Sequence, residues 1–592
     1  MRLQAEIVIR VSILLIPLLL NAQSPSGACA PAGRAEDLLA VKGEAGPCGG
    51  RLVISKSAEP KTFNPLTAGD AVTRDITGLL MADLIHINRG SGQAEGALAK
   101  SWTVSPDGRK YTLHLRRGLR FSDGQLFDAD DVIFTFQSYL DARIRSPQRD
   151  LLIIGGKPIQ VAKLDPYSVV FTLAQPYATA ERLFDGFAIL PRHLLQHSYE
   201  TGQLASAWAL STPPAQIAGL GPFRLKQYTP GQRVILERNP YYWKTDANRQ
   251  RLPYLDEIAV IFVASRDAEA LRFEAGETDV VSRLSAASFA ALEKRQQGSR
   301  FRLYDLGPGF EYSFLFFNLN RPSSNNSSLR EEQTWFQQIP FRKAVAAAVD
   351  RDSIVRLAFR GRAAPLSVEI TPGNKIWRNR DIPPPVHSPQ QARQLLQQAH
   401  FSWGSDGSLK DAGGKRIQFS VLVNAGNEQQ MQMATLIQQD LKEIGIEAPP
   451  VPLDSHSLLH RIFTSHEYEA AIIAMADGDS NPNTEMNILL SRGSAHLWDL
   501  TSSYLPPWQN EIDSLMQKQL VTRNFGERKR IFDKVQDLLW QNMPAVFLAS
   551  PDILVGAKNR VGNFHPALFG DYTLWNAEQL FIRKEPDAAG HS

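Results

Sequence analysis

The stretch that decides the fold, residues 97–139, reads A-L-A-K-S-W-T-V-S-P-D-G-R-K-Y-T-L-H-L-R-R-G-L-R-F-S-D-G-Q-L-F-D-A-D-D-V-I-F-T-F-Q-S-Y. Residues 105–108, S-P-D-G, have the composition of a type I turn, because proline presets φ at the second position and glycine suits the fourth. The turn joins residues 102–104 to residues 111–116, where apolar and polar side chains alternate with the period of a half-buried strand. The stretch therefore begins with a β-hairpin.

A capped helix follows the hairpin. A second turn at residues 122–124, S-D-G, leads to Asp128, which we expect to cap the N-terminus of a helix running to Leu140. Asp131 stands at the third helical position, which gives an acidic version of a capping box. The local order predicted here is hairpin, turn and helix.

The wording of this stretch closely resembles the family 5 extracellular solute-binding proteins of peptide-type ABC importers, which carry ALA-SW-VSPDG-YTFHLR-GV-FSDG-AEDV-FSF almost letter for letter. A match of about forty positions in order is far more specific than a short glycine motif. The matching positions include Gly118, Phe121, Ser122, Asp123, Gly124, Ala129, Asp131, Val132 and Phe134.

The resemblance continues on both sides of the opening stretch. Residues 49–55 and 59–65 are similar to the start of the family's mature chain, and residues 219–223 and 237–243 are similar to its GTGPYKL and LERNPNYW blocks. The glycines of the third block suggest a loop that needs positive φ or close backbone contact. In all, the resemblance covers residues 49–564, which is nearly all of the expected mature chain.

The resemblance implies an α/β protein with a two-lobe periplasmic binding protein-like fold, of the cluster C type, with an inserted extra subdomain. Alternating strands and helices after Leu255 agree with an α/β class. The implied boundaries are a signal peptide at 1–22, a flexible tether at 23–48, lobe I at 49–88, 218–307 and 545–584, the inserted subdomain at 89–217, lobe II at 308–544 and a tail at 585–592.

Composition is that of an ordinary globular protein. Of 592 residues, 43% are hydrophobic and 21% are charged, and the 64 Lys and Arg nearly balance the 61 Asp and Glu. Because the charges of both signs are interleaved along the chain, we expect no nucleic acid partner. We also expect a monomer.

The N-terminus has the pattern of an export signal. Arg2 and Arg10 precede an apolar run, residues 11–20, that is too short to span a bilayer and ends before a small residue, Ala22. We therefore expect a periplasmic or cell-envelope protein, with an uncleaved anchor as the alternative. In an exported chain Cys29 and Cys48 suit a disulfide, whereas lipid attachment at Cys29 is the alternative role for that cysteine.

The sequence gives no support for an enzyme. It holds no HExxH, GxSxG, P-loop or paired CxxC motif, and its 12 histidines are scattered. Residues 477–481 copy the start of a calcium loop, but Pro482 stands where a glycine must turn the chain, and Ile488 stands where a glutamate is needed. We therefore expect no catalytic residue, no metal and no cofactor.

The same segment carries the ligand site that the resemblance implies. Peptide-binding relatives place a GW pair after a short buried strand, then an aspartate that pairs with the peptide's α-ammonium, then a proline. Here the tryptophan position falls on Met475, the proline on Pro482, and the aspartate position lies between Asp477 and Asp479. In a dry cleft such a charge-assisted bond is strong. Two solvated loop acids are the alternative interpretation.

Three further residues complete the predicted ligand site. Asn481 ends the segment that contains the two aspartates, and Arg461 lies where some relatives place a cation for the ligand carboxylate. Arg461 suits a surface helix equally well. Trp498 lies in a loop-like region beyond Asn481, where an aromatic side chain is placed to meet a ligand.

The resemblance implies the solute-binding component of an ABC importer. It captures di- or oligopeptides between its lobes by hinge closure and delivers them to a membrane permease with its ATPase. Because the tryptophan is lost, a nickel complex, an oligosaccharide or an opine is the alternative ligand. A sensor or chaperone-like module of the same fold is the alternative from another class.

Overall fold

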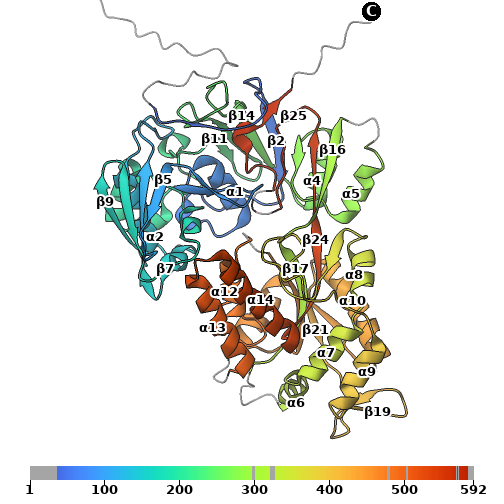
Figure 1. Cartoon of the computed structure of the whole chain (residues 1–592). Coiled ribbons are helices and arrows are strands. Elements are labelled where there is room, and N and C mark those ends of the chain that lie inside the picture. The colour runs from blue at the N-terminus through green and yellow to red at the C-terminus, as the bar shows by residue number, and fades with distance from the viewer. Residues whose placement is uncertain are drawn as a thin grey trace, which may run out of the picture.

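The computed structural model describes residues 36–296, 300–320, 327–476, 480–501, 505–568, 570 and 572–583. Figure 1 shows two lobes, one above the other, with a smaller group of strands and helices beside the upper lobe. We call the upper one lobe I and the lower one lobe II. None of the helices in the described part is both long and apolar enough to cross a membrane.

One sheet of 12 strands runs through both lobes in the order β11-β12-β14-β2-β15-β24-β17-β23-β21-β22, with β16 and β18 also paired to β24. In lobe I, β2, β14 and β15 run parallel; in lobe II, β21, β22 and β23 do. The lobe I strands are β2 (Arg51–Lys56), β11 (Phe223–Thr229), β12 (Arg233–Arg238), β14 (Glu257–Phe262) and β15 (Val280–Val281). The lobe II strands are β17 (Glu311–Phe317), β21 (Val421–Asn424), β22 (Pro450–Leu453) and β23 (Ala470–Ala476).

The long strand β24 (Ala545–Lys558) joins the two lobes (Figure 1). Its first half pairs with β17 in lobe II, and its second half pairs with β16 (Phe301–Pro308) and β15 in lobe I. At its middle, β18 (Ala363–Pro365) pairs with residues 549–551. The chain thus crosses between the lobes on β24 and on the connection from β16 to β17.

Helices cover the sheet in each lobe. Lobe I carries α1 (Ala71–Leu80), α4 (Arg266–Ala275) and α5 (Ala286–Glu293). Lobe II carries α6 (Ser327–Phe336), α7 (Ile339–Ala348), α8 (Arg351–Ala358), α9 (Pro389–Gln398), α10 (Glu428–Glu443), α11 (Ser455–His460), α12 (Met486–Leu489), α13 (Pro507–Val521) and α14 (Phe525–Asn542). Their buried side chains form one core in lobe II, from Tyr312 to Ala549. Most of lobe I shares a second core with the smaller sheet, and α4 and α5 pack in a third, small core.

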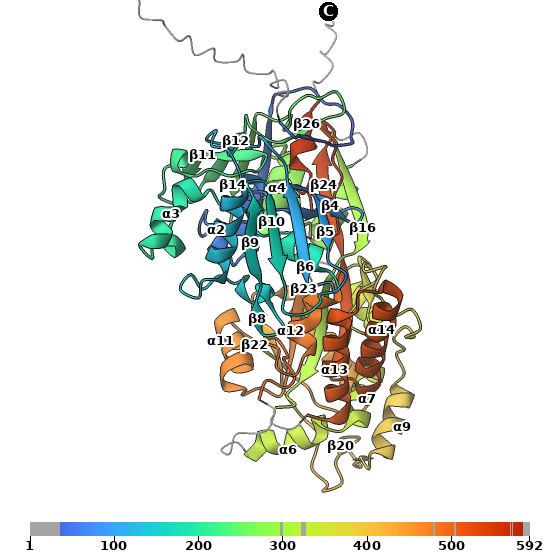
Figure 2. The same cartoon turned by 60° about the vertical axis from the view of Figure 1, so that its left-hand side comes forward.

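The stretch at residues 97–139 folds as its sequence predicts. Its hairpin is β5 (Ala99–Val104) and β6 (Lys110–Leu115), and Gly108 N donates to Ser105 O at 2.8 Å in the turn. Asp128 caps α2 (Ala129–Leu140), and both bonds of the capping box with Asp131 are present. With β9 (Gln160–Asp165) and β10 (Ser168–Thr172) the hairpin makes the four-stranded sheet visible beside lobe I in Figure 2. Helix α3 (Arg192–Glu200) packs on α2.

The matched block at residues 219–223 packs against α1 and the opening stretch through its glycines. A Cβ on Gly221 would lie 2.4 Å from Leu80 C, and one on Gly219 would lie 2.0 Å from Leu80 O. Neither glycine has a positive φ, so close backbone approach, rather than a left-handed conformation, requires glycine here. Ser122 N donates to Gly219 O at 2.9 Å, which ties the block to the opening stretch.

The structure corrects two expectations near the N-terminus. Residues 76–87 look helical in the sequence, but α1 begins after the N-cap Asp70 and ends at Leu80, and Ile85–Ile87 is strand β3. Residues 36–48 belong to the predicted flexible tether, yet β1 (Leu39–Ala40) pairs in parallel with β13 (Lys244–Thr245). Backbone pairing fixes this part, since it needs no large side chains. Cys48 is disulfide-bonded; Cys29, the other cysteine, lies outside the described residues.

Candidate functional site

The two lobes present the carboxyl ends of their parallel strands toward the space between them. In lobe I, β14 leads to Arg266 and β15 leads to Arg283; in lobe II, β23 leads to the segment at residues 477–481. Strand β17 runs antiparallel to β23, so its first residue, Glu311, pairs with Ala476 at the same edge. Ligands of open α/β sheets bind at this edge, which makes the interlobe space the candidate site.

A short hinge segment sets how the lobes meet. Gly307, near the end of β16, has φ +77°, a conformation that favours glycine. Gly309 follows it, and its backbone N donates to Pro551 O of β24 at 3.0 Å. Thr371 Oγ1 donates to Gly309 O at 2.6 Å. The two crossing strands are therefore hydrogen-bonded to each other where they pass from one lobe to the other.

An ion pair bridges the lobes beside this hinge. Arg283 Nη2 of lobe I donates to Glu311 Oε2 of lobe II, and its guanidinium lies 5.4 Å from the ring centre of Tyr572. Desolvation alone would lower the pKa of Arg283, but the Glu311 carboxylate outweighs it, so this pKa is raised. The lobes thus meet through a charged contact at the base of the candidate site.

The predicted segment lies at the edge of lobe II that faces lobe I. Met475 pairs with Tyr312 in the sheet and is partly buried, and Ala476 is exposed. Asp477 and Asp479 lie outside the described residues. Ser480 is buried, and its carbonyl accepts a 2.8 Å hydrogen bond from Asn374 Nδ2. The two ends of the segment are therefore fixed to lobe II.

Asn481 belongs to a buried polar network around Arg528 of α14. The Arg528 side chain is 2% exposed, lies 4.8 Å from the ring centre of Trp377, and donates to Asn481 Oδ1 at 2.8 Å and Asn483 Oδ1 at 2.9 Å. Gln519 Nε2 of α13 donates to Asn483 Oδ1 at 3.0 Å. Because Arg528 and Gln519 join these asparagines to α13 and α14 of lobe II, the network holds residues 481–483 in one orientation.

The same asparagines contact the smaller sheet that lies beside lobe I. Asn483 Nδ2 donates to the Tyr177 hydroxyl at 2.7 Å, and Asn481 Nδ2 lies 3.4 Å from Thr179 Oγ1. Ala178 N donates to Leu520 O at 2.7 Å. Residues 177–179 follow β10 of the four-stranded sheet, so this sheet touches lobe II beside α12 and α13 (Figure 1). We call the contact the interlobe latch.

Two predicted site residues lie apart from these groups. Trp498 is 1% exposed and belongs to the lobe II core, where its ring packs 4.7 Å from the His496 ring. Arg461 directly follows α11 and is exposed. The structure thus brings Met475 and Asn481 to the interlobe edge and places Trp498 inside the lobe.

Four functional candidates belong to no sequence motif, and only Glu311 has a weak signal in the sequence. Arg283, Glu311, Arg528 and Tyr177 come from separate parts of the chain and belong to no motif that we recognise. The weak signal is that Glu311 is a charged residue directly before the apolar run at residues 312–317. Such a position suggests a strand that starts at an exposed edge.

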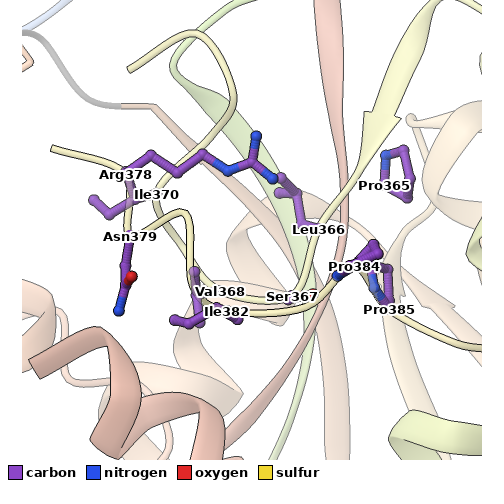
Figure 3. Close-up of a pocket in the computed structure, with 10 residues that line it drawn as sticks. All are labelled: Pro365, Leu366, Ser367, Val368, Ile370, Arg378, Asn379, Ile382, Pro384 and Pro385. Carbon is purple, nitrogen blue, oxygen red and sulfur yellow. The ribbon is translucent and has the colours of Figure 1, made fainter. Parts of the chain in front are cut away.

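One recess in lobe II and one charged cluster near Asp83 do not suit a large ligand. Figure 3 shows a recess in lobe II between Leu366 and Ile382, with a volume of about 30 Å³ that holds little more than one water. In lobe I, Asp83, His86 and Asp185 converge, and Arg89 Nη1 lies 3.1 Å from Asp185 Oδ2. The two carboxylates raise the pKa of His86 to about 9 against the opposing effect of desolvation. Ion pairs therefore account for this cluster.

Known proteins resemble the chain over most of its length. The family described as bacterial extracellular solute-binding proteins, family 5 Middle, matches residues 93–496. A probable ABC transporter-binding protein of Deinococcus radiodurans is 26% identical over 523 residues, covering 85% of this chain and 87% of that relative. The peptide transport periplasmic protein SapA of Salmonella typhimurium is 25% identical over 525 residues, covering 84% and 86%.

A solved structure agrees with this match. The oligopeptide-binding protein AppA of Bacillus subtilis, in complex with a nonapeptide, superposes with a TM-score of 0.70 at 22% identity, covering 91% of this chain and 100% of that one. The likeness shows that the two chains share a fold.

Proposed function

Because the chain belongs to the bacterial extracellular solute-binding proteins of family 5, we propose that it captures peptides between its two lobes and delivers them to an ABC importer. Two similar proteins support the ligand class, since SapA is named for peptide transport and AppA was solved with a nonapeptide. The observation that carries the proposal is the arrangement of the site. Strand ends of both lobes meet across a space that is bridged by Arg283 and Glu311.

The sequence places lobe I at residues 49–88, 218–307 and 545–584, an inserted subdomain at residues 89–217, and lobe II at residues 308–544. The pairings of β24 move the last boundary, because residues 545–549 pair with β17 of lobe II and pairing with β16 of lobe I starts only at Asp552. We therefore assign residues 308–549 to lobe II and residues 550–584 to lobe I, and keep the other boundaries. A chain that crosses twice beside one hinge can close on a ligand by rotation of one lobe.

Closure of the lobes is coupled to ligand binding, because the ligand has different affinities for the open and closed forms. The ligand binds the closed arrangement more tightly than the open one, because only the closed arrangement surrounds it on both sides. The interlobe latch between Tyr177 and Asn483 adds contacts that also exist only when the lobes are together. The closed form is the one that the membrane permease and its ATPase recognise.

The segment at residues 475–481 forms the lobe II wall of the ligand site. Asp477 or Asp479 pairs with the α-ammonium of the peptide, with Met475 and Asn481 on either side. Peptide backbone groups find partners in the protein backbone and in bridging water, which gives affinity without strong sequence preference. Binding involves no covalent step, so the protein acts as a carrier rather than as an enzyme.

Export places this activity outside the cytoplasmic membrane. Residues 1–22 act as a signal peptide, and the mature protein works in the periplasm or at the cell envelope as a monomer. Family members are described as extracellular.

Calorimetry on ligand-stripped protein tests the ligand class. The protein is unfolded in guanidinium, dialysed, refolded and titrated with a defined pool of di- to pentapeptides. We expect saturable binding and a smaller radius of gyration by X-ray scattering in the presence of the pool. A nickel–histidine complex and an oligosaccharide serve as matched alternatives. If one of these binds and the peptide pool does not, peptide capture is wrong.

A further inference from the structure

Two arginines of lobe I, Arg266 and Arg283, follow the ends of strands β14 and β15 beside the hinge. Arg283 pairs with Glu311, which belongs to lobe II. Arg266 is exposed, and among the described residues it makes no hydrogen bond or ion pair. Arg283, Glu311 and Tyr572 nonetheless lie close enough to influence it electrostatically. One of the two guanidinium groups at this edge therefore has an anion and the other has none.

Arg266 is in an electrostatically poor position for a cation. It is the first residue of α4, where the helix dipole disfavours positive charge. Desolvation and the neighbouring Arg283 guanidinium lower the pKa of Arg266, while Glu311 partly offsets them. A second anion at this place would relieve both unfavourable effects.

The surrounding acids are engaged elsewhere. Asp75 of α1 pairs with Lys56 Nζ at 2.6 Å. Glu269 is 5% exposed, and burial raises its pKa, against a hydrogen bond from Ser57 that lowers it. Neither carboxylate forms an ion pair with Arg266, and Glu311 forms one with Arg283 alone. Glu311 reaches Arg283 only from the opposite lobe.

We propose that Arg266 and Arg283 form a carboxylate subsite of the interlobe space, where Glu311 stands in this structure and a ligand carboxylate takes its place on binding. The subsite accepts the terminal carboxylate of a peptide or an acidic side chain. Guanidinium groups bind carboxylates through planar, charge-assisted hydrogen bonds that an amide cannot replace. The Arg283 guanidinium also lies over the ring of Tyr572, 5.4 Å from the ring centre.

Exchange of one carboxylate for another sets the affinity. The ligand gains the contacts of Arg283 only when Glu311 gives them up, so the native glutamate competes with the ligand. This competition predicts opposite effects on ligand affinity for the two partners, whereas a purely structural ion pair predicts the same effect for both. Loss of the arginine weakens ligand binding, whereas loss of the glutamate strengthens it.

The inference rests on the proposed peptide binding, and the experiment separates the two. Ligand-stripped wild type and the variants Arg283→Gln, Arg266→Gln and Glu311→Gln are titrated with two pools of tri- to pentapeptides that differ only in a free or an amidated C-terminus. We expect the wild type to prefer the free-acid pool by about tenfold or more. We expect Arg283→Gln and Arg266→Gln to lose this preference and Glu311→Gln to bind the free-acid pool more tightly than wild type.

Two control variants separate the effect of the subsite from a general effect of charge or folding. Arg272→Gln removes the same charge from the same helix at a residue that pairs with Glu277, and it should leave both affinities unchanged. Arg283→Lys retains the charge if Arg283→Gln folds poorly. If the wild type binds neither pool, peptide capture itself is wrong and the subsite falls with it. If both pools bind equally, or if Glu311→Gln and Arg283→Gln weaken binding alike, peptide capture stands and the subsite is wrong.

Discussion

The side-chain amide of Asn483 in lobe II donates a 2.7 Å hydrogen bond to the hydroxyl of Tyr177, which follows the four-stranded sheet beside lobe I. Asn483 is in turn fixed by Arg528 and Gln519 within lobe II. The contact therefore joins a rigid part of lobe II to the loop that follows β10. Its strength should influence how often the lobes separate.

Tyr177→Phe tests the interlobe latch. The substitution removes the hydroxyl that Asn483 contacts, so the closed form loses about 0.5–1.5 kcal/mol relative to the open form. We expect a larger radius of gyration by X-ray scattering without peptide, and faster peptide release. Tyr241→Phe, at a tyrosine that is 38% exposed, is the control and should change neither. Equal peptide release rates in Tyr177→Phe and Tyr241→Phe would show that the interlobe latch does not stabilise the closed form.

Arg528→Gln tests the network that holds residues 481–483. Three side-chain acceptors, on Asn481, Asn483 and Gln519, lose a charged donor in a buried place. We expect the free energy of unfolding in urea to fall by about 2–4 kcal/mol. Arg530→Gln, at an exposed position on the same helix, should cost little. A similar loss in both variants would show that general charge on α14, and not the network, matters.

Gly221→Ala tests the close approach of residues 219–221 to the end of α1. The added Cβ would lie 2.4 Å from the Leu80 backbone, so the loop or the helix end must move. We expect a loss of about 2 kcal/mol or more in the free energy of unfolding. The matched change Gly78→Ala lies inside α1 with nothing within 4 Å, and should raise stability by about 0.5–1 kcal/mol. Two variants of equal stability would contradict this reading of the glycine.

The raised pKa of His86 makes the stability of the folded protein depend on pH. Asp83 and Asp185 raise its pKa to about 9 against desolvation, above the ordinary value of 6.5. The folded protein therefore binds this proton more tightly than the unfolded chain does, and the stabilisation is complete below pH 6.5 and lost as pH rises through 9. We expect wild type to lose more stability between pH 6 and pH 9.5 than His86→Gln. An identical pH dependence in the two proteins would exclude this role, with exposed His197→Gln as the control.

Asp477 and Asp479 test the ammonium anchor. With alanine at both positions, affinity for peptides with a free N-terminus should fall by about tenfold or more, because a charged hydrogen bond is lost. Affinity for N-acetylated peptides should stay the same in wild type and variant. Calorimetry with both peptide pools measures the difference. Unchanged affinity for the free-amine pool would rule the anchor out.

Much of the fold could be predicted from the sequence where local rules and the family resemblance agree. The hairpin and capped helix of residues 97–139 follow from turn residues, alternation and Asp128. The length of β24 could not be predicted, because Pro551 lacks an amide donor and usually ends a strand. Here Pro551 sits at the hinge, where its carbonyl accepts from Gly309 N. Its place between the lobes makes the proline compatible with the strand.

The candidate site was only partly predictable. The edge of β23 could be located, because the buried strand before Met475 is visible in the sequence. Trp498 could not be recognised as core, since its surroundings look like a loop and its burial depends on residues far along the chain. Arg283 and Glu311 meet only because β24 brings the two lobes together. Neighbours across a hinge leave no periodic signal in either segment.

Native mass spectrometry of the protein purified from its own host identifies the bound ligand and so tests peptide capture. We predict a mass shift from bound ligand, which fragmentation identifies as peptides, which disappears after unfolding and refolding, and which returns with an added peptide pool. A bound species that fragments as a sugar or a metal complex, together with no uptake from the peptide pool, would contradict the account.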